Sequence, residues 1–257
     1  MKNLKSYIKF LLKSTNQHGV HSPFVYKLTT KCFYKKKRTK GKEVLKKYRK
    51  KLLNNTESIK ITDFGAGSRV FKSDKRAIKK IVKYAAISSK RANLLSEITH
   101  YFAPVNILEI GTSLGIATAA LHAGNPKAKI TTLEGSKITA DIARKQFDHF
   151  SFQNIDVIIG EFSKNLTALK IENSLDLVYF NAKGQKKATL EYFEYCLNFI
   201  NNDSFFIFND IHRDKEMEAA WKDIQNHPSV KVTIDTFQWG FVFFRREQEK
   251  EHFIIRV

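Results

Sequence analysis

The sequence predicts an α/β protein with a doubly wound, mostly parallel sheet of seven strands, an antiparallel C-terminal hairpin and a basic, mainly helical N-terminal extension. Two observations predict this fold. From Pro104 onward, short runs rich in β-branched and aromatic residues alternate with helix-length amphipathic stretches, and the last two runs lie only a few residues apart. We therefore divide the chain into an extension, residues 1–103, and a sheet domain, residues 104–257.

Five of the runs form the parallel part of the predicted sheet. They begin roughly 20–30 residues apart, which leaves room for a crossover helix, so the strands are expected to be parallel and buried on both faces. These runs are residues 105–110, 129–133, 155–159, 175–180 and 204–208. Two further runs follow near the C-terminal end of the sequence. The connection between them is too short for a crossover helix, so these two strands must pair antiparallel. These last two are residues 230–236 and 239–244.

The first hundred residues are typical of helices. Near the start, an apolar face alternates with lysines, and such a helix can pack on its own domain, which we favour, or lie on a membrane surface. The apolar face contains Leu4, Tyr7, Ile8, Leu11 and Leu12. Two further helices, over 74–87 and 90–102, are expected to lead into the first core strand.

Charge is concentrated in the extension. Residues 1–103 contain 27 Lys and Arg and 5 Asp and Glu, or 27 − 5 = +22, whereas residues 104–257 contain 18 and 20, or 18 − 20 = −2. The densest clusters are residues 35–38 and 46–51. A field of this size attracts RNA, anionic lipid or an acidic substrate, and the alternative is a solvated lysine-rich surface. The sequence has no RNA-recognition signature such as the RNP1 pattern.

The composition indicates a cytoplasmic protein without a transmembrane segment. No apolar run approaches the ~18 residues of a membrane span. Lysines interrupt every apolar stretch near the N-terminus, which differs from a signal peptide. The two cysteines, Cys32 and Cys196, provide neither a disulfide framework nor a paired metal-binding spacing.

The strongest motif is I-L-E-I-G-T-S-L-G, where a buried strand ends in an acid and a Gly-rich turn precedes a helix. The glycines allow close approach of the backbone to a ligand, and the hydroxyls can bind that ligand or cap the helix. The turn lacks the full dinucleotide pattern and a P-loop lysine, which favours a nucleoside with a charged amino-acid tail over a phosphate. A purely structural turn is the alternative. The candidate residues are Glu109, Gly111, Thr112, Ser113 and Gly115.

Two further strands carry candidate ligand residues where they end. Glu134 ends the second strand, where a carboxylate can accept hydrogen bonds from both hydroxyls of a ribose. Gly160, Glu161 and Phe162 end the third, where the acid can accept from an adenine amino group and the aromatic ring can pack on the base. Each residue alone could be a loop residue, but the strand ends of an open α/β sheet are its usual ligand site.

Over about residues 100–245 the sequence resembles class I S-adenosylmethionine-dependent methyltransferases. That resemblance implies a Rossmann-like fold, S-adenosylmethionine as cofactor, and contacts from Glu109 and the glycine turn to its methionine part. It also implies ribose binding by Glu134 and adenine binding by Glu161. More narrowly, the chain is similar to bacterial O-methyltransferase-like proteins. The shared segments are H-G-V-H-S-P-F-V-Y at 18–26, D-F-G-A-G-S at 63–68, E-M-E-A-A-W and F-F-R-R-E-Q.

The sequence departs from this family at the reaction centre. Catechol-type relatives hold a divalent cation with an Asp after the fourth strand and an Asp-Asn pair after the fifth; Asn181, Asn209 and Asp210 stand at these positions. One carboxylate and two amides suit a hard dication poorly, so the resemblance implies a metal-independent site. Lys183 lies near the family's catalytic lysine but is offset by one position.

Two functions follow from these features. The first is an S-adenosylmethionine-dependent methyltransferase with an unknown acceptor, in which Asp210 or His212 is the base and Asn181 lies at the reaction centre. The second is a degenerate methyltransferase that binds the cofactor and a polyanion, RNA or anionic lipid. His18 and His21 can belong to a lid over the substrate with Lys183 and Asn209, although we favour a turn that enters the helix at Phe24 as the explanation of the two histidines.

Overall fold

The computed structural model of the protein describes residues 4–35, 39–60, 75–181 and 185–257, with the side chains of 39 and 40 left out. The chain forms two compact units. We call residues 36–169 the central unit, and residues 1–35 together with 170–257 the terminal unit. The division by function into an extension, residues 1–103, and a sheet domain, residues 104–257, differs from these two units and stays a prediction.

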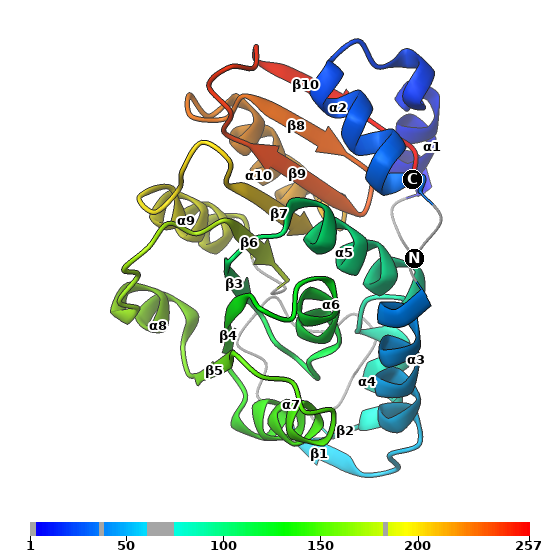
Figure 1. The fold of residues 1–257 in the computed structure, drawn as a ribbon, viewed down its shortest axis with the longest axis vertical. Helices are drawn as coiled ribbons and strands as arrows, with labels where there is room; N and C mark the ends of the chain where they lie inside the picture. The colour runs from blue at the N-terminus through cyan, green and yellow to red at the C-terminus, as the bar shows by residue number, and fades with distance from the viewer. Residues whose placement is uncertain (1–3, 36–38, 61–74, 182–184) are drawn as a thin grey trace. The chain divides into compact units, whose positions relative to one another are not determined.

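Three parallel strands form the sheet of the central unit, in the order β3-β4-β5 (Figure 1). Helix α6 connects β3 to β4, α7 connects β4 to β5, and α8 follows β5. The bounds are β3 Asn106–Ile110, α6 Ile116–Gly124, β4 Lys129–Glu134, α7 Lys137–His149, β5 Ile155–Ile159 and α8 Phe162–Ala168. Residues 107–110 of β3 are all buried, as expected for a parallel strand covered on both faces.

The other elements of the central unit come from the predicted extension. Helices α3 (Thr39–Leu53) and α5 (Ser89–Phe102) pack on α6, and α4 (Ile78–Tyr84) packs on α3. Strands β1 (Ser58–Lys60) and β2 (Lys75–Ala77) form a small antiparallel pair. The extension up to residue 102 therefore contributes directly to the core around the first crossover helix.

Five strands form the sheet of the terminal unit, in the order β10-β8-β9-β7-β6. Strands β6 and β7 are parallel, β9 is antiparallel to both β7 and β8, and β10 is parallel to β8. Helices α9 and α10 pack on each other. The bounds are β6 Leu177–Phe180, α9 Lys186–Leu197, β7 Phe205–Asn209, α10 Lys215–Asn226, β8 Val232–Asp235, β9 Trp239–Phe243 and β10 Glu251–Ile254.

The N-terminal helices of the terminal unit lie beside the C-terminal strand (Figure 1). The backbone of Thr15 bonds to Ile254 and Arg256, and the hydroxyl of Tyr34 donates to the carbonyl of Arg256 at 2.6 Å. Phe33 packs on Phe241 with ring centroids 5.3 Å apart. The elements are α1 Leu4–Lys13, the 3₁₀-helix Gln17–Gly19, α2 Pro23–Leu28 and the π-helix Thr29–Phe33.

The predicted α/β class with a mostly parallel sheet is confirmed, and the seven expected strands correspond to β3 to β9. Two details differ among the described residues. The expected helix over 74–87 begins only at Ile78, because Lys75–Ala77 pairs with β1 as a strand. Strand β10 was not expected, since the segment E-H-F-I-I is short and begins with polar residues. No helix in the described ranges is long and apolar enough to span a bilayer.

Candidate cofactor and reaction sites

The turn between β3 and α6 is bonded to the neighbouring strand. The backbone N–H groups of Gly111 and Thr112 both donate to the carbonyl of Leu133, at 2.9 and 3.0 Å. Gly111 has φ 106° and Ser113 has φ 51°, so the chain reverses within a few residues by using left-handed conformations. The turn predicted from the Gly-rich motif thus lies at the carboxyl end of the parallel strands, where open α/β sheets bind ligands.

Gly115 serves a packing purpose within this turn. Its φ is 74°, and a Cβ there would lie 2.4 Å from the Tyr48 hydroxyl oxygen and 2.6 Å from the Phe147 ring. The same Tyr48 hydroxyl donates to the carbonyl of Leu114 at 2.9 Å. In this structure the Tyr48 hydroxyl of α3 approaches the Gly115 backbone closely, and a ligand contact at Gly115 stays a prediction.

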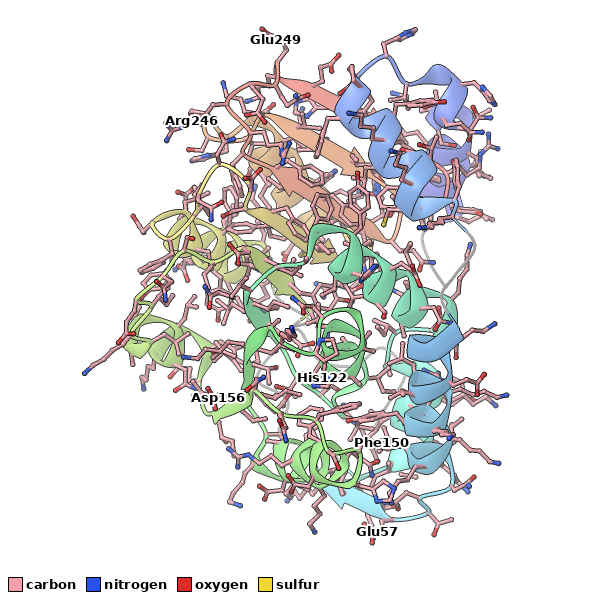
Figure 2. All side chains as sticks on the ribbon, viewed as in Figure 1. Glu57, His122, Phe150, Asp156, Arg246 and Glu249 are labelled. Carbon is pink, nitrogen blue, oxygen red and sulfur yellow. The ribbon has the colours of Figure 1, made fainter. Side chains whose placement is uncertain are left out.

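A cluster of aromatic side chains packs around Tyr48, next to the Gly-rich turn between β3 and α6. Tyr48 packs against Phe147, Phe150 and Phe152, with ring centroids 6.3, 5.2 and 6.0 Å away. His122 of α6 stacks on Phe152 at 4.3 Å; Figure 2 labels His122 and Phe150. Tyr48 is almost fully buried, so α3 and the end of α7 hold the Gly-rich turn in a fixed position.

Glu109 is a fully buried carboxyl group at the end of β3. The hydroxyls of Thr118 and Thr132 donate to its Oε2 at 2.5 and 2.7 Å, and Thr112 Oγ1 lies 2.6 Å from Thr132 Oγ1. Its other oxygen, Oε1, is buried and has no hydrogen-bond partner among the residues that the structure describes. Burial raises the pKa of Glu109 to about 8, although the two threonine hydrogen bonds act in the opposite direction. An orphaned buried carboxyl oxygen is costly and fits a site that receives a cationic ligand.

Glu134 connects two of the loops at the same sheet edge. Its Oε2 accepts from the backbone N–H of Ser113 at 2.7 Å, and its Oε1 accepts from Ser136 at 3.0 Å. Burial raises the pKa of Glu134, while the N–H groups of Ser136 and Ser113 act to lower it. Ser136 also caps α7, because its hydroxyl accepts from the Thr139 N–H at 3.4 Å. Glu134 therefore orients the β3 turn relative to the start of α7.

The third predicted loop lies beside these two. Gly160, with φ 136°, donates its N–H to the carbonyl of Glu134 at 2.9 Å. Glu161 is exposed and pairs with Lys164 at 3.0 Å, and this hydrogen bond is the main reason why the pKa of Glu161 lies below its usual value. Phe162 is half-buried at the start of α8. The Asn165 side chain lies next to Gly160, and its amide nitrogen is buried without a hydrogen-bond partner.

The candidate reaction residues come together at the ends of β6 and β7. Asn209 Nδ2 donates to Asn181 Oδ1 and to Asp210 Oδ2, each at 3.4 Å. The indole N–H of Trp239 donates to Asn209 Oδ1 at 3.0 Å, so the oxygen of this amide faces the tryptophan and its NH₂ faces the other two side chains. Asp210 has φ 56°. An NH₂ group therefore stands between the two oxygens that a cation would need to share.

His212 has carboxylates on both ring nitrogens. Its Nε2 lies 2.7 Å from Asp235 and its Nδ1 lies 3.1 Å from Glu218, and its ring stacks on Phe237 at 5.1 Å. Burial alone would lower the pKa of His212, but the hydrogen bonds and charges of Asp235 and Glu218 outweigh it, so the pKa lies above its usual value. This arrangement suits a positively charged imidazolium better than a base with a free lone pair.

The H-G-V-H-S-P-F-V-Y segment packs on the F-F-R-R-E-Q segment. Phe24 meets Phe243 edge-on at 5.0 Å, and the Arg245 guanidinium lies 4.8 Å above the Phe24 ring. Ser22 caps α2, and its hydroxyl lies 3.5 Å from Gln248 Oε1. The two segments that carry the narrower resemblance are thus in contact with each other.

Some predicted residues stand apart from these contacts. His18 and His21 are exposed on the turn before α2, and a lid role for them stays a prediction. Lys183 and the D-F-G-A-G-S segment at 63–68 lie outside the described residues, as do residues 36–38 of the first basic cluster. The lysines of the second basic cluster are exposed on α3. Within the described ranges, no group of three or more His, Cys, Asp or Glu side chains is arranged to hold a metal ion.

Sequence reasoning missed several residues that hold these sites. Thr118 and Thr132, which bind Glu109, lie inside a helix and a strand with no motif around them. Tyr48 is more than sixty residues from the turn it supports. Trp239 begins its run two residues after Phe237, and only the antiparallel register of β7 and β9, which pairs it with Asn209, reveals its role. No local pattern predicts such contacts, because they depend on strand pairing.

Residues 108–211 match a family model described as a methyltransferase domain. No curated protein matches the chain. Similar solved structures include an O-methyltransferase from Bacillus cereus in complex with SAH, with 19% identity and a TM-score of 0.54, which covers 85% of this chain and 94% of that chain. An SAH-bound methyltransferase from Podospora anserina has 14% identity and a TM-score of 0.61, with 88% and 97% covered.

A third structure, the O-methyltransferase TomG from Streptomyces achromogenes in complex with SAM, has 17% identity and a TM-score of 0.54, with 62% and 82% of the chains covered. The fold of the chain is therefore that of class I S-adenosylmethionine-dependent methyltransferases, and the similar structures include O-methyltransferases. The resemblance noted in the sequence is confirmed at this level.

Proposed function

We propose that the protein is an S-adenosylmethionine-dependent methyltransferase of the O-methyltransferase type. The observation that carries this proposal is the buried Glu109 carboxyl group, whose Oε1 has no hydrogen-bond partner in the described part of the chain, and the Glu134 carboxyl group at the same sheet edge. S-adenosylmethionine is a cation with an ammonium group and a ribose, so it offers donors to both carboxyl groups. The Bacillus cereus, Podospora anserina and Streptomyces achromogenes structures contain SAH or SAM, which supports the same cofactor here.

The residues of the central unit fit this cofactor. We assign the methionine part to Glu109 and the turn that includes Thr112 and Ser113, and the ribose to Glu134. The adenine then lies by the Gly160 loop, where Phe162 can pack on the base. Asn165 joins this set, because its buried amide nitrogen lies next to Gly160 and has no acceptor within the described ranges. When bound, the cofactor supplies an activated methyl group on a sulfonium.

The residues of the terminal unit are assigned to the methyl acceptor. Transfer to oxygen requires removal of a proton from the acceptor, and Asp210 is the carboxylate available for it. Asn181 and Asn209 orient that carboxylate and the acceptor through amide hydrogen bonds. We assign His212 a positioning role, because both of its ring nitrogens face carboxylates.

We propose that the reaction needs no metal. The Asn209 NH₂ group points at the oxygens of Asn181 and Asp210, and a nitrogen that donates hydrogen bonds cannot coordinate a cation. A hard dication also prefers several anionic oxygens, whereas this group has one carboxylate.

Two measurements test the function. Calorimetry with S-adenosylmethionine and with its demethylated product establishes whether the cofactor binds. Transfer of a labelled methyl group to fractionated cell extract, with a chelator or with added magnesium, then identifies the acceptor. We expect binding and transfer that the chelator does not change. Failure of both ligands to bind contradicts the proposal, and transfer that needs magnesium contradicts metal independence.

A further inference from the structure

Helix α1 exposes a row of large aliphatic side chains. Leu4 is 68% exposed, Ile8 49% and Leu12 82%, although all three are large hydrocarbons. They lie at i, i+4 and i+8 and therefore form one continuous row along the helix. A row of this kind on a single short helix differs from isolated surface leucines, which need no explanation.

The row is exposed while another face of α1 is docked on the protein. Phe10 is buried and packs on Phe237 with ring centroids 5.4 Å apart, and Tyr7 meets the same ring at 4.8 Å. Phe237 in turn stacks on His212. These contacts hold α1 against the terminal unit by its aromatic side, so the aliphatic row is directed away from this contact.

Lysines border the aliphatic row on one side. At about 100° per residue, Lys5, Lys9 and Lys13 follow one another along a line next to Leu4, Ile8 and Leu12. All three lysines are exposed, and the helix L-K-S-Y-I-K-F-L-L-K contains no acidic residue. An apolar row bordered by cations is the pattern of a helix that lies in the plane of a lipid surface.

We propose that α1 docks the protein on an anionic lipid bilayer, with Leu4, Ile8 and Leu12 in the acyl boundary and the three lysines at the phosphates. Two features favour this occupant. A nucleic acid would neutralise the lysines but leave the aliphatic row in water. A second copy packed row to row would bring two lysine lines together, and like charges repel. The helix has ten residues, so it is too short to cross the bilayer and lies along its surface.

Sedimentation with vesicles tests this surface in the full chain. The vesicles are phosphatidylcholine alone or phosphatidylcholine mixed with phosphatidylglycerol. We expect binding to the anionic vesicles, and loss of more than about a hundredfold in the partition coefficient in the variant Leu4→Gln, Ile8→Gln, Leu12→Gln. The variant Leu53→Gln is the matched control, because Leu53 is an exposed leucine on α3, and it should bind like the wild type. Replacing Lys5, Lys9 and Lys13 by Gln should remove the preference for anionic vesicles.

Results of three kinds would overturn the proposal. The first kind is a vesicle result: the wild type does not sediment with anionic vesicles, or the triple Gln variant binds them as well as the wild type does. The second is that light scattering shows a dimer for the wild type and a monomer for the triple variant, which would assign the row to contact with a second copy. The third is a fall of more than a few degrees in the melting temperature of the triple variant, which would show that the row is covered within the chain itself. The proposal does not depend on the proposed methyltransferase function.

Discussion

The strand ends of the two units differ in how they use acidic side chains. In the central unit, Glu109 and Glu134 end adjacent strands, and their carboxyl groups are held by threonine hydroxyls and backbone N–H groups. In the terminal unit, the corresponding ends carry Asn181, Asn209 and the single acid Asp210. Buried carboxyl groups cost free energy, whereas paired amides cost little.

This difference indicates where a charged ligand is expected. The central unit retains an unpaired carboxyl oxygen at Glu109, which a cation would stabilise. In the terminal unit, the amide of Asn209 donates to the oxygens of Asn181 and Asp210, so these oxygens already accept hydrogen bonds within the protein. The contrast fits the two proposals made above, a cofactor site in the central unit and a metal-independent reaction site in the terminal unit.

The largest expected effect comes from replacing Gly115 by Ala. The new Cβ would collide with Tyr48 and Phe147, and the alanine residue would have to keep φ 74°. We therefore expect the free energy of unfolding to fall by more than about 3 kcal/mol. Chemical denaturation measures this loss. Gly41→Ala in α3 is the control, because its Cβ would lie 3.2 Å from the Ser96 hydroxyl oxygen and at ordinary contact distances, 3.7 and 3.8 Å, from Ala123, and it should be close to neutral. Equal stability of the two variants would contradict the packing role of Gly115.

Replacing Glu134 by Ala should weaken binding of S-adenosylmethionine by about 1–3 kcal/mol, because a charge-assisted hydrogen bond to the ribose is lost. Calorimetry measures the change. Glu134→Gln separates ribose binding from the connection between the β3 turn and α7. The amide oxygen of the glutamine can still accept from one backbone N–H and keep part of that connection. Unchanged cofactor affinity in the Ala variant would show that the ribose assignment is wrong.

The double change Asn181→Asp and Asn209→Asp should give the terminal unit the acidic group it lacks. Together with Asp210 it would provide three carboxylates, so we expect magnesium affinity to rise by at least about tenfold over the wild type. Calorimetry with magnesium chloride measures it, with Asn198→Asp on the exposed end of α9 as the control. If the double variant binds magnesium no better than this control, the alignment of these residues with the metal ligands of the family is incorrect.

The last prediction concerns pH and Glu109. Its pKa of about 8 in the folded protein lies above the ordinary value of 4.5, so the folded state binds the proton more tightly than the unfolded state does. Its contribution to stability is therefore present at low pH and is lost as pH rises from 4.5 through about 8. Glu109→Gln should flatten this part of the profile when unfolding is measured at several pH values. Parallel profiles for the variant and the wild type would show that Glu109 is ionised when folded.

Much of the fold could be predicted from the sequence because its signals are local. The alternation of apolar runs and amphipathic stretches places β3 to β9 within a residue or two, and the short connection before Trp239 requires the antiparallel pair. The glycine turn and the acids at the strand ends were also visible, since residues that follow parallel strands meet at one sheet edge.

Tertiary structure alone decided the environments of these residues. Burial and the threonines make Glu109 an acid of raised pKa, and strand pairing brings Trp239 to Asn209. The aromatic side of α1, rather than its aliphatic row, packs on Phe237, although the sequence shows both as apolar. Periodicity identifies which residues share a face, but only the packing of distant segments decides what that face touches, because burial and partners are properties of the whole fold.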